Sequence, residues 1–76
     1  MNGLNIRREQ FDGDNATTQF TLTKVIYNNS QRPFIGGDIL YKGVGYTVGV
    51  NLKDINLATP LLVGQTLVVF YVEVAP

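Results

Sequence analysis

Residues 11–23, FDGDNATTQFTLT, contain the spacing of oxygen-bearing side chains that comes closest to an ion-binding loop. Calcium-binding loops place oxygen ligands at alternate positions, and the helix–loop–helix version ends with a glutamate at the twelfth position. Asp12 and Asp14 fill the first two places, but the third falls on Ala16 and the twelfth on Thr23. The pattern favours a turn whose aspartate side chains bond the local backbone, and a weak cation site at these two aspartates is the alternative.

Two other patterns fall short of catalytic signatures. GVGYTV (43–48) begins like a dinucleotide-binding fingerprint, but Val48 stands where the last glycine is required, which favours a glycine-bearing hairpin. Asp38 and Asp54 would be paired carboxylates for glycoside hydrolysis, yet each stands beside a predicted turn. The chain also has no histidine and no cysteine, which are frequent general bases and zinc ligands. We predict a non-enzymatic protein with no catalytic residue, no cofactor and no metal.

The basic residues do not form a convincing electrostatic site. Arg7, Arg8 and Arg32 are half of the six basic residues, and Glu9 adjoins the first two, so an ordinary charged surface is favoured. The net charge of zero argues against nucleic acid or an anionic membrane as the partner. Asn28-Asn29-Ser30 fits the glycosylation sequon, but without an export signal we interpret it as a loop.

The length of 76 residues predicts a single domain spanning 1–76. Such a chain buries only about 60% of the surface that its unfolded form exposes, and small domains often depend on a staple or a partner. The first ten residues, MNGLNIRREQ, lack the apolar core of a signal peptide, and the longest apolar run, LVVFYV (67–72), is too short to span a bilayer. We therefore expect a soluble protein without an export signal of its own.

Short strands separated by turn residues make up the predicted secondary structure, because no ten-residue stretch has a helical period with caps. The expected strands are 4–11, 18–23, 38–41, 44–50, 55–58 and 66–74. Residues 24–37 are expected to form a long surface connection, and Lys42-Gly43 a tight turn between two strands. The pattern predicts an all-β fold, a small antiparallel β-sandwich or partly open barrel of about six strands.

The predicted core draws on most of the expected strands. Its members are Phe11, Phe20, Leu22, Ile39, Val48, Val68, Phe70 and Val72. In the first strand, alternation places Leu4 and Ile6 on the same side as Arg8 and Gln10.

The last strand, 66–74, is apolar on both faces. Val68, Phe70, Val72 and Val74 form one face, and Leu67, Val69, Tyr71 and Glu73 the other. A strand with one solvated face alternates apolar and polar residues, so the second face is covered either by a loop of this chain or by another chain. The second alternative makes Leu67, Val69 and Tyr71 interface candidates, and Tyr27, Arg32 and Phe34 in the long connection are the next candidates.

Three segments carry a resemblance: FDGDNATTQFTLT (11–23), DILYKGVGYTV (38–48) and INLATPLLVGQTLVVFYVE (55–73). Together they resemble a small β-sandwich module common in tailed-bacteriophage virion proteins, met most often in tail fibres and other appendages. That module has a Gly-Asp or Gly-Thr turn before Phe-Thr-Leu, then a hairpin leading to Tyr-Thr-Val, and a last β-branched run ending in tyrosine. This chain departs from it in the longer segment 24–37 and in Lys42-Gly43 at the hairpin, where the module has Asn-Gly.

The resemblance implies a structural component of the virion that binds other virion proteins, as a capsid decoration protein or a tail, fibre or neck accessory. It also implies a homo-oligomer, with a trimer favoured by the three-fold symmetry of fibres. Hydrophobic burial and backbone pairing at strand edges would hold the partners. The alternative is a carbohydrate or host-receptor binding module that uses exposed aromatic side chains. Its candidates are Tyr27, Phe34, Tyr41 and Tyr46.

Overall fold

The computed structural model describes residues 5–74, and these form seven β-strands and no helix. The strands are β1 (Asn5–Asp12), β2 (Gln19–Thr21), β3 (Arg32–Ile35), β4 (Asp38–Ile39), β5 (Tyr46–Val48), β6 (Asp54–Leu57) and β7 (Thr66–Glu73). The predicted all-β class is confirmed. The strand predicted from residue 4 begins at Asn5 in the structure, and Leu4 lies outside the described residues.

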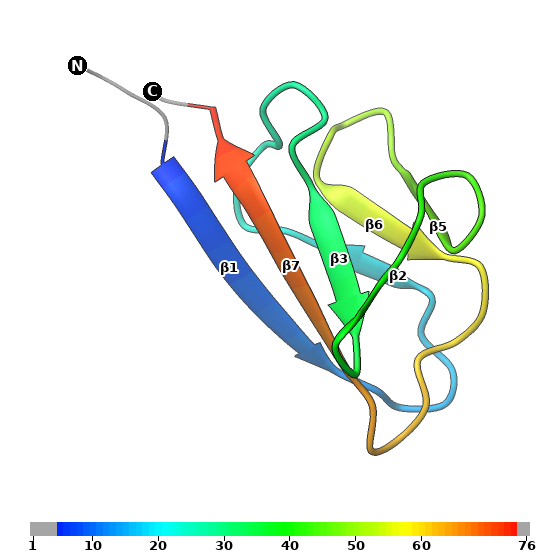
Figure 1. Cartoon of the computed structure of the whole chain (residues 1–76). Helices are drawn as coiled ribbons and strands as arrows, with labels where there is room; N and C mark the ends of the chain where they lie inside the picture. The colour runs from blue at the N-terminus through cyan, green and yellow to red at the C-terminus, as the bar shows by residue number, and fades with distance from the viewer. Residues whose placement is uncertain (1–4, 75–76) are drawn as a thin grey trace.

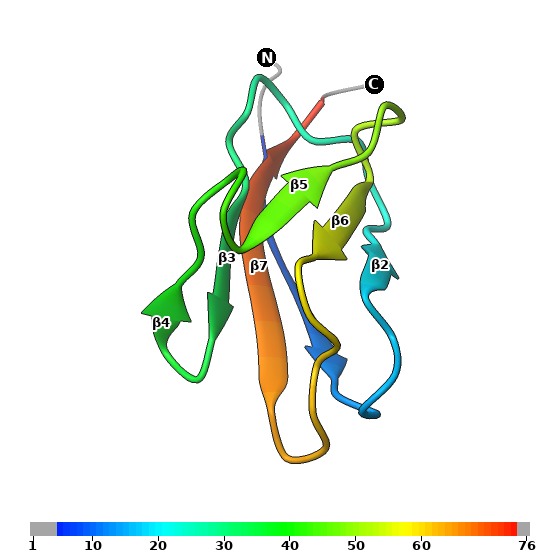
Figure 2. The same ribbon diagram turned by 90° about the vertical axis from the view of Figure 1, so that its right-hand side faces the viewer.

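The strands form two antiparallel sheets that pack face to face (Figures 1 and 2). The front sheet, which faces the viewer in Figure 1, has the order β1-β7-β3-β4, and the back sheet has the order β2-β6-β5. The chain crosses between the sheets after β1, β2, β4 and β6. This arrangement is a small β-sandwich, as predicted.

The core lies between the inner faces of the two sheets. It contains Phe20, Leu22, Ile26, Tyr46, Ile55, Leu57, Leu61, Leu67, Val69 and Tyr71. Phe20 and Leu22 are buried as predicted, and Phe11 and Val48 pack against the core while partly exposed. The rings of Phe11 and Phe20 lie 5.2 Å apart and so join the two sheets near the end of β1.

The predicted core was wrong for the front sheet. Val68, Phe70 and Val72 point outward from β7, and Ile39 of β4 is also exposed. The inner face of β7 carries Tyr71 and Glu73. These polar side chains can be buried because they find hydrogen-bond partners inside the sandwich: Glu9 and the backbone of Lys24 for Tyr71, and Arg7 for Glu73. The presence of a tyrosine and a glutamate on one face of β7 therefore did not mean that this face is exposed to solvent.

Residues 24–37 do not wander over the surface as expected. They contain β3, which lies between β7 and β4 in the front sheet, and Pro33 is fully buried there. The Pro33 carbonyl accepts from Leu40 N at 2.9 Å, on the side away from β7. The missing N–H of Pro33 therefore faces the short β4 side, and the β3–β7 ladder loses nothing.

The expected hairpin around Lys42-Gly43 is also different in the structure. β4 belongs to the front sheet and β5 to the back sheet, so the turn joins the layers rather than two paired strands. Val44 N donates to Tyr41 O at 3.0 Å, and Gly43 has a φ of 84°, a conformation that glycine adopts without strain. Lys42 is thereby held at the edge where the two sheets meet.

No helix in residues 5–74 has the length and apolar character that crossing a membrane requires.

Candidate functional site

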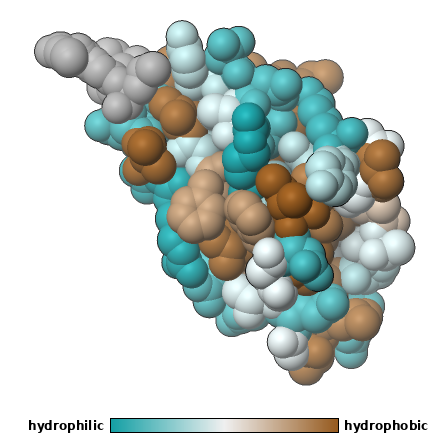
Figure 3. Space-filling model, in the orientation of Figure 1, coloured by the Kyte–Doolittle hydropathy of each residue, from teal (hydrophilic) through white to brown (hydrophobic). Residues whose placement is uncertain are grey.

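The outward face of the front sheet carries a cluster of apolar side chains, which we call the outer apolar face: Phe34, Val68, Phe70 and Val72. The rings of Phe34 and Phe70 meet edge to face at 5.9 Å, and Phe70 is 41% exposed. Figure 3 shows apolar residues gathered over β7 and β3, with hydrophilic residues along β1. A hollow of about 300 Å³ lies over Phe34, Val68 and Phe70, and Arg8 and two glycines of the β3–β4 turn complete its lining.

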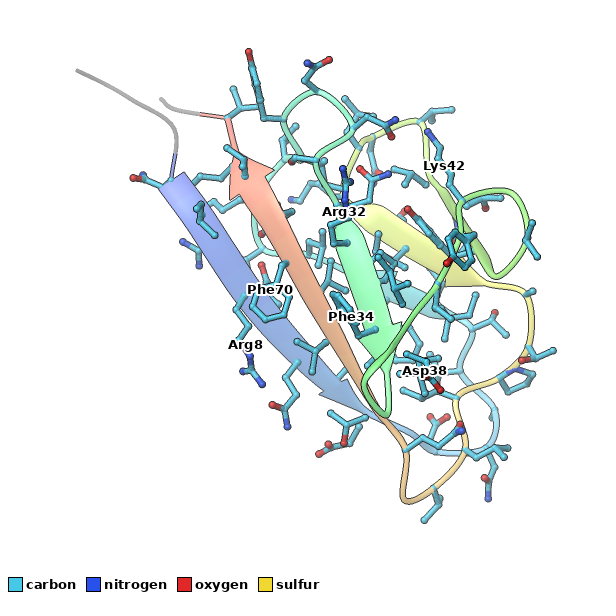
Figure 4. All side chains as sticks on the ribbon, in the orientation of Figure 1. Arg8, Arg32, Phe34, Asp38, Lys42 and Phe70 are labelled. Carbon is cyan, nitrogen blue, oxygen red and sulfur yellow. The ribbon has the colours of Figure 1, made fainter. Side chains whose placement is uncertain are left out.

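Two arginines flank Phe70 on this face. Arg8 of β1 and Arg32 of β3 are both cross-strand partners of Phe70, one on each side (Figure 4). Gln10 and Phe34 flank Val68 in the next row in the same way. Arg8 Nη2 donates to Gln10 Oε1 at 2.9 Å. The outer apolar face is therefore a ring-centred surface with positive charge on both sides.

The free edge of β1 adjoins this face. Val72 directs its backbone away from β1, because its carbonyl accepts from Tyr27 N at 2.8 Å and its N–H donates to Ser30 Oγ at 2.9 Å. Hydrogen-bonded pairs alternate along an antiparallel ladder, so the backbone groups of Ile6, Arg8 and Gln10 face away from β7. These groups lie along the free edge of β1, which is eight residues long and to which a further strand could add.

The first three interface candidates are not on any surface. Leu67, Val69 and Tyr71 are 0%, 0% and 1% exposed, and they pack in the core. The interpretation that this face meets another chain was wrong: the back sheet of the same chain covers it. Packing of one sheet on the other buries the inner face of each sheet.

The other three candidates lie in different settings. Phe34 belongs to the outer apolar face, Arg32 is exposed beside it, and Tyr27 is half-exposed in the turn that precedes β3. Asn28 and Asn29, at the centre of that turn, both have positive φ values, and Ser30 N donates to Tyr27 O at 3.0 Å. Asparagine tolerates this conformation, which is typical of a type I′ turn. The structure thus brings Arg32 and Phe34 to one face, and Tyr27 N donates to the carbonyl of Val72, a member of that face, at 2.8 Å.

A second concave region lies at the edge of β3, where the 40–45 segment crosses to the back sheet. It is a cavity of about 300 Å³, and Arg32, Lys42, Tyr41 and Tyr46 are among its lining residues. Figure 4 shows Arg32 and Lys42 at the same end of β3. The sequence patterns gave no role to Lys42, because its neighbours were expected in a hairpin turn.

A polar network closes the sandwich between β1 and β7. Glu9 accepts from the Tyr71 hydroxyl and from Thr23 N and Oγ1, the last at 2.9 Å. Arg7 Nη1 donates to Glu73 Oε1 at 3.1 Å, and Arg7 Nε is 4.0 Å from Glu9 Oε2 and makes no hydrogen bond. This network ties the first and last strands to the segment that leaves β2.

The network changes the acidity of two of its groups. Burial alone would raise the pKa of Glu9, but the bonds from Tyr71 and Thr23, with Arg7 nearby, outweigh it, and the pKa of Glu9 is lowered. Burial, followed by the bond to Glu9, raises the pKa of Tyr71 to about 12. Glu9 is therefore an ionised structural acceptor at neutral pH rather than a general base.

The 12–17 loop is a turn that bonds its own backbone. Asp14 Oδ1 accepts from Ala16 N at 2.9 Å and from Thr17 N at 2.7 Å, and Oδ2 accepts from the Thr17 hydroxyl. These bonds, led by that hydroxyl, lower the pKa of Asp14 to about 2. The loop is pressed onto the 61–65 segment, since a Cβ at Gly13 would lie 1.9 Å from Leu62 O. The turn interpretation accounts for both Asp14 oxygens.

The remaining catalytic candidates are not brought together. Asp38 lies in the front sheet and Asp54 in the back sheet, where Thr21 Oγ1 donates to Asp54 Oδ1 at 2.7 Å. Arg7 points inward and bonds Glu73, whereas Arg8 and Arg32 lie on the outer face with Phe70 between them, so the three arginines do not form one basic patch. Within residues 5–74 no group of three acidic side chains is arranged to hold a metal ion.

Comparison with protein-family models, with curated proteins and with solved structures finds no match to this chain.

Proposed function

We propose that this protein is a non-enzymatic structural component of a bacteriophage virion. In this proposal it binds other virion proteins, and further copies of itself, through the outer apolar face. The observation that carries the proposal is the exposure of Phe70 and its neighbours on a face of the sandwich that no other part of residues 5–74 covers. Contiguous exposed apolar surface on a small protein commonly marks an interaction site.

The proposal takes its biological setting from the resemblance of residues 11–73 to the small β-sandwich module of tailed-phage virion proteins. Capsid decoration and a tail, fibre or neck accessory are the roles that such a module implies. The β1 edge supports the same kind of role, because its free backbone groups at Ile6, Arg8 and Gln10 allow strand addition beside the apolar cluster.

The mass of the purified protein in solution tests the proposal. We expect light scattering to give a multiple of the chain mass of 8.4 kDa, because burying the apolar cluster stabilises association. Three copies are favoured by the three-fold symmetry of the fibres in which the similar module occurs. Phe70→Ser should shift the mass toward the monomer and keep the thermal transition. Val50→Ser is the matched control, since Val50 is fully exposed and remote in sequence from the face. A monomer at every concentration, unchanged by Phe70→Ser, would contradict the proposal of self-assembly.

A second candidate function is glycan binding at Tyr41. Of the four aromatic candidates, Tyr46 is buried, Phe34 packs on Phe70, and Tyr27 is 40% exposed but does not line the cavity. Tyr41 is 69% exposed and lines the cavity beside Asn29. An exposed ring beside an amide is the arrangement that stacks on a sugar and bonds its hydroxyls. Titration with neutral sugars, monitored by the fluorescence of Tyr41 against Tyr41→Ala, tests it; an unchanged response in the variant excludes this site.

A further inference from the structure

We infer that the cavity between Arg32 and Lys42 binds a carboxylate, carried by an acidic residue of a partner protein whose apolar neighbour rests on the outer apolar face. The placement of that partner rests on the proposed function, whereas the carboxylate site itself rests on the cavity alone. Three observations support it: uncompensated charge, fixed donors and continuity with the apolar cluster.

The charge of the cavity is not neutralised by this chain. Arg32 and Lys42 both line it, and no acidic side chain does. Within residues 5–74 the ion pairs all involve Arg7, so neither cation has a carboxylate within 4.0 Å. Asp38 of β4 pairs with Ile35, at the end of β3 opposite Arg32 (Figure 4). Two cations on a concave surface favour an anionic ligand.

The cations are held in place by neutral acceptors, which fix them and leave their charge intact. Arg32 Nη1 donates to the carbonyls of Gln31 at 2.7 Å and Asn29 at 3.2 Å. Lys42 Nζ donates to Asn29 Oδ1 at 3.0 Å, and the same oxygen accepts from Gln31 Nε2 at 2.8 Å. The Asn29 turn thus orders both side chains before a ligand arrives, which lowers the entropic cost of binding.

A buried hydroxyl supplies a further donor at the same place. Tyr46 is 4% exposed and lines the cavity, and its oxygen accepts from Gln31 Nε2 at 3.2 Å. Among residues 5–74 this hydroxyl makes no other side-chain hydrogen bond, so its proton is available to an acceptor. A carboxylate is acceptor-only and has two oxygens, which matches one hydroxyl donor and two cations.

The cavity is continuous with the outer apolar face. Arg32 is the cross-strand partner of Phe70, and Ile39 at the cavity edge is the partner of Phe34. A partner that places an apolar side chain on the two rings therefore has an acidic residue within reach of Arg32. This continuity favours a protein ligand over a free acid. A nucleic-acid phosphate chain is disfavoured by the zero net charge of the protein.

Nuclear magnetic resonance titration of the full chain tests the carboxylate site directly. The probe is the blocked dipeptide acetyl-Leu-Glu-amide, and its control is acetyl-Leu-Gln-amide, which has the same shape without the charge. We expect the Glu peptide to shift the backbone amides of Arg32, Lys42 and Tyr46 with a dissociation constant on the order of 1 mM, and the Gln peptide to bind at least about fivefold more weakly. Added salt should weaken the binding of the Glu peptide and leave the binding of the Gln peptide unchanged.

Matched lysine variants locate the charge. Lys42→Met keeps the aliphatic stem and should weaken the Glu peptide by about threefold or more, whereas Lys24→Met, at an exposed lysine outside the cavity, should leave it unchanged. Equal binding of the two peptides, or indifference to Lys42→Met, overturns the inference. Glucuronic acid is the third probe: shifts with this acid and none with the Glu peptide would overturn the protein partner in favour of an acidic sugar.

The outcomes separate this inference from the proposed function. Peptide titration is done on Phe70→Ser as well as on the native chain. Carboxylate-dependent shifts at Lys42 in a native chain that stays monomeric would leave the carboxylate site standing and contradict the proposed assembly. The same shifts in Phe70→Ser would show that the carboxylate site does not depend on Phe70. Self-association through Phe70 without any carboxylate-dependent shift would contradict only the inference.

Discussion

The two faces of β7 have nearly the same side chains and opposite surroundings. The inner face, with Leu67, Val69 and Tyr71, is sealed against the back sheet, whereas the outer face, with Val68 and Phe70, is open to solvent. Hydrophobicity therefore does not distinguish them. The difference lies in the surroundings of each face. The second sheet covers the inner face, whereas the outer face has no covering layer in residues 5–74 and has an arginine on each side of Phe70.

The largest effect that separates the two faces should come from a charge. Val69→Lys places an ammonium in the dry core, which costs several kcal/mol without a partner and is enough to unfold a domain of this size. Val68→Lys, one residue away on the open face, can extend its ammonium to water and should keep a cooperative thermal transition. A folded Val69→Lys protein, measured by circular dichroism melting, would contradict the assignment of the inner face.

Truncation should give the same ranking with smaller numbers. Leu67→Ala removes a fully buried side chain and should cost about 2–5 kcal/mol of unfolding free energy. Phe70→Ala loses partly exposed area and the edge-to-face contact with Phe34, about 1–2 kcal/mol. Urea denaturation measures both. A greater loss for Phe70→Ala than for Leu67→Ala would reverse the two faces.

The sequence predicted the class of fold and the position of most strands, because turn residues and β-branched runs are local signals. It did not predict which face of β7 was inside, because period-two alternation is uninformative when both phases are apolar. A signal was nevertheless present in β1. Phe11 was expected in the core, and alternation puts Glu9 and Arg7 on the same side, where they require polar partners such as Tyr71 and Glu73.

The proposed binding surface was predictable only in part. Phe34 and Arg32 were named as candidates, although Pro33 concealed the strand that holds them. Phe70 was assigned to the core, and Lys42 was placed in a hairpin turn, so neither was named. Proline argues against a central strand when only the local sequence is known. Its tolerance here depends on the short β4 and on the side toward which its nitrogen points, and both are tertiary facts.

The polar end of the inner face sharpens the comparison. Tyr71→Phe removes the hydroxyl that donates to Glu9, and should cost roughly 1.5–3 kcal/mol at pH 7, because hydrogen bonds to charged groups are the stronger ones. The folded-state pKa of Glu9 is below its usual value of 4.5, so the carboxylate contributes stability above that pH. This contribution is lost as the pH falls through the lowered value.

The acid dependence of Tyr71→Phe is therefore part of the same prediction. The difference in unfolding free energy between the native protein and the variant should narrow when urea denaturation is repeated at pH 3. Glu9→Gln should show the same narrowing, because it removes the titrating group itself. An equal difference at both pH values would mean that the hydroxyl acts through packing and not through the carboxylate.

The smallest effect is expected at Asp14, whose carboxylate is bonded like that of Glu9 but stands in solvent. Its pKa of about 2 in the folded protein, against the usual 3.8, means that it contributes stability above pH 3.8 which is lost between pH 3.8 and 2. Solvent screens this contribution, so Asp14→Asn should lower the melting temperature less than Glu9→Gln does at pH 7.

Asp12→Asn is the control for Asp14→Asn, since the Asp12 side chain makes none of these turn bonds. The melting temperatures of Asp14→Asn and the native protein should converge at pH 2, where the native carboxylate is about half protonated or more. Calcium should not raise the melting temperature of the native protein or of Asp14→Asn. A ligand stabilises only the state that it binds, and both Asp14 oxygens already accept local bonds. A calcium-dependent rise that Asp14→Asn removes would restore the cation site. A larger loss for Asp14→Asn than for Glu9→Gln would show that a bonded carboxylate contributes as much in solvent as between the sheets.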